Sequence, residues 1–78
     1  MKFSVIYTPE SGYTETFGPF NSIKEAKEWM ADDFNHNCDV AKKAGADVQW
    51  TWNERNHQTL GSCEIEGLGS WEITRLYN

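Results

Sequence analysis

Two histidines and two cysteines are the residues of this 78-residue chain best suited to bind a metal. His36, Cys38, His57 and Cys63 have the stoichiometry of a zinc site, but zinc ligands usually come in close pairs such as C-x2-C and H-x3-H. Here an H-x-C pair is separated by eighteen residues from an H-x5-C pair. On a helix, His36 and Cys38 would also point roughly 200° apart. We therefore expect no metal site and no cofactor.

The same side chains give little support for nucleophilic catalysis. Cys63 and His57 are the closest thiol and imidazole, but neither lies at a predicted helix N-terminus that would lower the thiol pKa. The segment GLGS at 67–70 lacks the lysine and the following helix of a phosphate-binding loop. We predict that the protein is not an enzyme. A small hydrolase or redox enzyme that uses Cys63 and His57 is the competing hypothesis.

The stretch EWMADDFNHNCD at 28–39 concentrates acidic charge. Helical geometry divides it, because Met30, Phe34 and Cys38 recur at the spacing of a buried face. The charged side chains fall in a sector of about 80° on the opposite side of the helix. These residues, which we call the acidic ridge, are Glu25, Glu28, Asp32, His36 and Asp39. The pattern is typical of a solvated helix face and also of a surface that contacts a basic partner.

Trp29 is predicted to lie where this charged face meets the buried one. A tryptophan at such a border is a frequent anchor of protein interfaces, and it can equally cover the edge of a small core. The predicted partner-binding residues are Glu25, Glu28, Trp29, Asp32, His36 and Asp39.

The helix that carries these residues has clear end signals. SIKE at 22–25 is a capping box, in which Ser22 accepts from the Glu25 backbone and the Glu25 side chain reaches back to Ser22. Gly45 follows Lys42 and Lys43 and predicts the end of a helix of about 22 residues. The predicted buried stripe is Ile23, Ala26, Met30, Phe34, Cys38, Ala41 and Ala44. Asn35 and Asn37 are poor helix formers that would permit a kink.

Five segments show the alternation or composition of β-strands. They are residues 2–8, 13–17, 48–52, 58–66 and 70–77. With the helix they give the order ββαβββ, which predicts a single α+β domain over residues 1–78, a twisted antiparallel sheet with one long helix packed across one face. The other face must then be solvated, dimerised or used by a partner.

The net charge of −5 argues against direct binding of nucleic acid, because proteins that bind the phosphate backbone usually carry a basic patch. The segment WTWNERNH at 50–57 places two tryptophans near an arginine, as a base-stacking surface would, but it has no RNA-binding signature around it. The first residues lack the pattern of a signal peptide, and no segment is apolar enough to span a membrane. With two cysteines and no disulfide framework, we expect a cytoplasmic protein.

The compact α+β pattern, acidic balance, high aromatic content and lack of catalytic motifs resemble those of small phage-encoded inhibitors such as anti-CRISPR proteins. The resemblance covers the whole chain and is one of class. It implies a non-enzymatic inhibitor that works in the host cytoplasm by binding a host complex that handles nucleic acid. The inhibitor would occupy the basic nucleic-acid-binding groove, either by charge mimicry through the acidic ridge or as a steric block through aromatic contacts.

A second hypothesis is a small bacterial ligand-binding or subunit-assembly domain that uses the open sheet face. It predicts a homodimer, or a pocket formed by Trp50, Trp52 and Trp71. The protein is thus expected to be a monomer or a homodimer.

Overall fold

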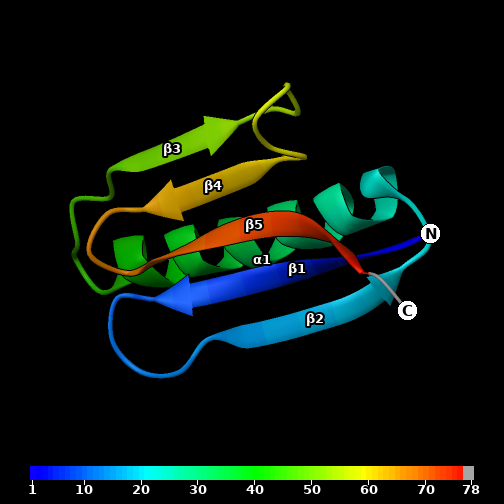
Figure 1. The fold of residues 1–78 in the computed structure, drawn as a ribbon. Coiled ribbons are helices and arrows are strands. Elements are labelled where there is room, and N and C mark those ends of the chain that lie inside the picture. Colours follow the sequence, from blue (N-terminus) through cyan, green and yellow to red (C-terminus); the bar gives the residue numbers. More distant parts are fainter. Residues whose placement is uncertain (77–78) are drawn as a thin grey trace.

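A computed structural model describes residues 1–76 and confirms the α+β fold with the order ββαβββ (Figure 1). The elements are β1 (Lys2–Pro9), β2 (Glu15–Phe20), α1 (Ile23–Lys43), β3 (Trp50–Asn53), β4 (Ser62–Ile65) and β5 (Gly69–Leu76). The five strands form one sheet in the order β2-β1-β5-β4-β3, with antiparallel pairs throughout. Figure 1 shows α1 lying across a single face of this sheet.

The helix begins and ends where its local signals predict. The Glu25 N–H donates to Ser22 Oγ at 3.1 Å, which confirms the N-cap. The prediction for the Glu25 side chain was wrong by one residue, because its carboxylate accepts from the Asn21 N–H at 3.1 Å and not from Ser22. The helix continues through both asparagines, and the Asn37 side chain donates to the Asp33 carbonyl at 2.8 Å.

β2 runs further than the sequence predicted. The strand predicted over residues 13–17 in fact spans Glu15–Phe20, so Gly18, Pro19 and Phe20 belong to it. The register shifts between Phe3 and Val5 of β1, which leaves an extra residue of β2 in a bulge. Proline is tolerated there because β2 is an edge strand and its outer N–H groups have no ladder partner to lose.

The later strands are shorter than, or shifted from, the predicted segments. β3 starts at Trp50 instead of residue 48, and residues 58–61 form a loop before β4. In this loop the Asn56 side-chain oxygen accepts hydrogen bonds from the backbone N–H groups of Gln58 and Thr59 at 2.7 and 3.1 Å. This local turn competes with strand pairing. β5 ends at Leu76, and residue 77, predicted to belong to the last strand, lies outside the described residues.

The two faces of the sheet differ in chemistry. Under the helix lies a core whose buried hydrophobic residues are Val5, Ala26, Met30, Phe34, Cys38, Cys63, Ile65, Trp71 and Ile73. The opposite face is mostly polar and includes Ser4, Thr8, Thr51, Ser62, Glu64, Ser70, Glu72 and Thr74. Ser4 Oγ and Thr74 Oγ1 share a hydrogen bond of 2.9 Å across it. This face has the composition of a solvated surface and not of an obligate dimer interface.

Candidate functional site

The five residues of the acidic ridge all lie exposed along the outer side of α1. Among residues 1–76 the one ion pair joins Lys27 to Glu54 at 2.6 Å, and it involves no ridge residue. The Glu25 carboxylate also accepts a hydrogen bond from the Asn21 N–H at the helix N-terminus. The charges of Glu28, Asp32 and Asp39 are therefore free to attract a basic surface.

Trp29 lies at the border of the ridge, as predicted, and is half-buried. Its ring centroid lies 4.4 Å from that of Phe17 and 6.0 Å from that of Phe20, both on β2. These contacts show that Trp29 covers the core at the β2 side of the helix. Its predicted contact with a partner stays a prediction.

Three tryptophans surround Phe34 of the helix. The centroid of the Phe34 ring lies 5.8 Å from that of Trp50, 5.6 Å from that of Trp52 and 5.8 Å from that of Trp71. Trp71 is buried, Trp52 is half-buried and Trp50 is 58% exposed. All three lie on the face that the helix covers, so a pocket formed by them cannot belong to the open sheet face.

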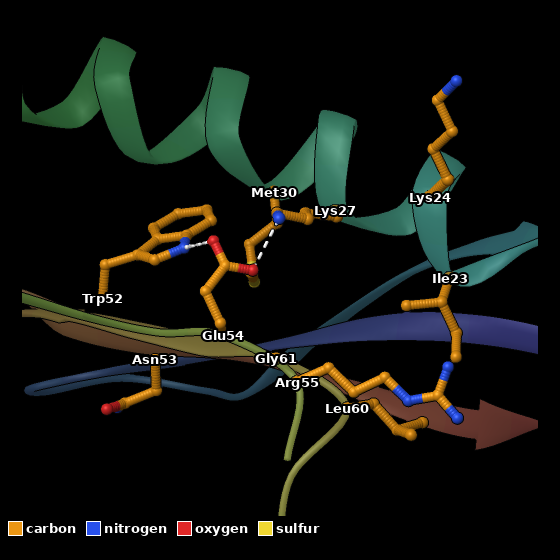
Figure 2. Close-up of a pocket in the computed structure, with 10 residues that line it drawn as sticks. All are labelled: Ile23, Lys24, Lys27, Met30, Trp52, Asn53, Glu54, Arg55, Leu60 and Gly61. Atoms are coloured by element: carbon orange, nitrogen blue, oxygen red, sulfur yellow. Dashed lines mark hydrogen bonds and ion pairs between the residues drawn. The ribbon is translucent and has the colours of Figure 1, made fainter.

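A groove runs between α1 and β3 because the helix lies chiefly over β1, β5, β2 and β4. On one side of Trp52 a cavity of about 340 Å³ has Ile23, Met30 and Leu60 among its lining residues (Figure 2). On the other side a cavity of about 480 Å³ is lined in part by Phe34 and Trp50. Trp52 lines both cavities and separates them.

Hydrogen bonds link three side chains, Lys27, Glu54 and Trp52, in the wall of the first cavity (Figure 2). The Trp52 indole donates to Glu54 Oε1 at 2.9 Å, and Lys27 Nζ lies 2.6 Å from Glu54 Oε2. These two hydrogen bonds, that from Lys27 first, lower the pKa of the Glu54 carboxyl below its ordinary value. Arg55 and Lys24 also line this cavity, so a local excess of positive charge lies between β3 and the first turns of α1.

Asp33 has a role in the core that the sequence pattern did not reveal. The buried Trp71 indole donates to Asp33 Oδ2 at 2.9 Å, and the Trp71 ring lies 4.7 Å from that of Tyr7. Burial raises the pKa of the Tyr7 hydroxyl, and the charge of Asp33 raises it further. One signal was present, since Asp33 follows Met30 by three positions and Ala26 by seven and thus borders the buried stripe.

The thiols and imidazoles lie in different environments. Cys38 and Cys63 are both free and buried, and burial raises the pKa of the Cys63 thiol to about 12. His36 and His57 are exposed. Within residues 1–76, no three side chains of His, Cys, Asp or Glu gather as ligands of one metal ion. Because its pKa is raised, the Cys63 thiol stays protonated at neutral pH and is a weak nucleophile.

We predict that Cys63 is protected from thiol reagents. At pH 8 the folded Cys38→Ser variant is expected to react with a disulfide reagent at least tenfold more slowly than the same variant in urea, because folding both buries the thiol and raises its pKa. Absorbance of the released thiolate measures the rate. Equal rates with and without urea would contradict the burial of Cys63.

No helix within the described part of the chain is long and apolar enough to cross a membrane. Comparisons of the chain with known protein families, with curated proteins and with solved structures found no match.

Proposed function

We propose that the protein is a non-enzymatic protein–protein interaction module whose contact surface is the acidic ridge. The observation that supports this proposal is the exposure of all five ridge residues on one side of a single rigid helix, with none of them in an ion pair among residues 1–76. A helix holds such charges in a fixed arrangement, so a partner that matches it gains specificity as well as attraction.

The partner that fits this surface is a protein complex with a basic groove for nucleic acid. Carboxylates along the helix would attract the lysine and arginine side chains that otherwise hold phosphates. The protein would then act as an inhibitor of the phage-encoded, anti-CRISPR-like class, which binds a host complex in the host cytoplasm and blocks its groove. Trp29, at the ridge border, would add an aromatic contact to the charged ones.

The test of this proposal is charge reversal on the ridge. The variant Glu28→Lys with Asp32→Lys is expected to lose at least tenfold in affinity for host proteins that the wild type captures, because two attractive contacts become repulsive. Binding of the wild type is also expected to weaken as salt rises from about 50 to 500 mM. Affinities are measured by biolayer interferometry on the captured complex, and a labelled DNA oligonucleotide reports whether its groove is blocked.

A matched control reverses the same number of charges elsewhere. Glu64→Lys with Glu66→Lys gives the same net charge, but Glu64 lies on β4 and Glu66 in the turn directly after it, and both are exposed. This variant is expected to bind within about threefold of the wild type. The proposal fails if both double variants lose affinity equally, if salt has no effect, or if the DNA stays bound to the captured complex.

A further inference from the structure

β3 ends the sheet, and within residues 1–76 no strand pairs with its outer edge. The Glu66 N–H donates to the Gln49 carbonyl at 2.9 Å, so this pair is hydrogen-bonded. Bonded and non-bonded pairs alternate along an antiparallel ladder. The backbone N–H and C=O groups of Thr51 and Asn53 therefore form hydrogen bonds with β4. Those of Trp50 and Trp52 point to the free edge.

The two edge strands of the sheet, β2 and β3, differ in how well they can pair with another chain. β2 carries Pro19 and a bulge, features that discourage pairing with another chain. β3 has the sequence WTWN, with no proline, no charge and no register shift against β4. Its Trp50 is 58% exposed, which leaves a large apolar side chain beside unpaired backbone groups. β3 is also short, with four residues, which limits the number of backbone hydrogen bonds that it can add.

We propose that the free edge of β3 pairs antiparallel with β3 of a second copy of the chain, centred on Thr51. With Thr51 opposite Thr51 of the second copy, Trp50 lies opposite Trp52 of the second copy, and the reverse holds by symmetry. This register joins both outward-pointing residues of each copy within the strand itself. Shifts of two residues in either direction would pair Trp50 or Trp52 with positions 48 or 54, outside β3.

The charges flanking β3 are complementary in this register. Asp47 precedes the strand by three positions and Arg55 follows it by two, so in this antiparallel arrangement the end of β3 that carries Asp47 lies beside the end that carries Arg55 in the second copy. The two-fold axis makes this pair occur twice. Both residues are exposed, and neither forms an ion pair in the part of the chain that the structure describes. The edge is therefore complementary to itself in backbone, aromatic and charged groups.

The pairing has a defined architecture. Strands paired in one sheet share their faces, so both helices lie on the same side of the joined sheets. The tryptophans of the two copies form one row on that side, while the Thr51 side chains meet on the polar side. This dimer contact does not involve the acidic ridge, so the dimer can be tested independently of the proposed function.

The test uses two single variants of the full chain. Wild-type protein in a sedimentation-equilibrium series from about 5 µM to 1 mM is expected to rise from its monomer mass of 9.0 kDa towards twice that value. Asp47→Arg alone and Arg55→Asp alone each place like charges opposite each other twice. Each is expected to weaken self-association about tenfold.

An equimolar mixture of the two variants provides the decisive measurement. In a mixed dimer, the new Arg at 47 meets the new Asp at 55, and the retained Arg55 meets the retained Asp47. The mixture is expected to recover dimerisation, with mixed dimers dominant in native mass spectrometry. The proposal is overturned if the wild type stays monomeric at 1 mM, if either variant dimerises like the wild type, or if mixing gives no recovery. Far-UV circular dichroism confirms that each variant is folded.

Discussion

Replacement of Trp71 by alanine is expected to lower the free energy of unfolding by about 3–5 kcal/mol. The side chain is 1% exposed and lies at the centre of the core, with its ring 5.8 Å from Phe34 and 4.7 Å from Tyr7. Its removal leaves a cavity and deprives the Asp33 carboxylate of its indole donor. A domain of this length is stabilised by only about 4–12 kcal/mol, so a large share of its stability is at stake.

Two further variants separate packing from hydrogen bonding at this position. Trp71→Phe keeps an aromatic ring and removes the N–H, and it is expected to cost about 1–3 kcal/mol. Asp33→Asn keeps a carbonyl acceptor for the indole, and it is expected to cost less than about 1 kcal/mol. Urea unfolding followed by circular dichroism gives all three values. A loss below about 1 kcal/mol for Trp71→Ala would show that the core does not depend on this side chain.

The sequence predicted the helix and its faces well because both depend on local spacing. Ser22 caps the helix, Ala26, Met30, Phe34 and Cys38 are buried, and all five ridge residues are exposed. The prediction that Ala44 continues the buried stripe was wrong, because Ala44 is the exposed C-cap residue. The cap follows from the short Ser22–Glu25 spacing, and the burial and exposure follow from a repeat of 3.6 residues along one continuous segment. The strand segments were recognised for the same reason, since alternation is also local.

What the sequence could not predict depends on which distant residues meet. Nothing in the order of residues pairs β1 with β5, and this pairing brings Trp71 beside Tyr7 and beneath Asp33. The contact of Asp33 with Trp71 could not be predicted for that reason. The extra length of β2 follows from a bulge opposite β1, and the groove beside Trp52 exists only because β3 extends past the helix. Such features arise from tertiary packing and leave a weak local signal.

The two proposed surfaces would reinforce each other. The acidic ridge lies on the outer side of α1, and pairing through β3 would place two helices on the same side of one continuous sheet. A dimer would then present two ridges to one partner, and binding of the second would raise the overall affinity without new contacts. Variants at Asp47 and Arg55, which lie off the ridge, are therefore expected to weaken partner binding only where the partner offers two basic sites.

Gly69 is the second position where a small change has a large expected effect. It begins β5, where it pairs with Pro9 of β1 and Ile65 of β4. A Cβ atom added to it would lie 2.8 Å from the Thr8 carbonyl oxygen and 2.7 Å from Tyr7 Oη. The tyrosine could rotate away, but the backbone oxygen belongs to a paired strand and can move only if the start of β5 separates from β1. We expect Gly69→Ala to cost about 1–3 kcal/mol.

Gly67 in the same turn is the matched control, because its cost has a different origin. Its φ of +81° is unfavourable for alanine, but an added Cβ would meet no atom within 4 Å. Gly67→Ala is therefore expected to cost about 1 kcal/mol, from backbone conformation alone. Urea unfolding of the two variants compares them directly. If Gly67→Ala proved the more damaging, β5 would not approach β1 as closely as the contacts of Gly69 require.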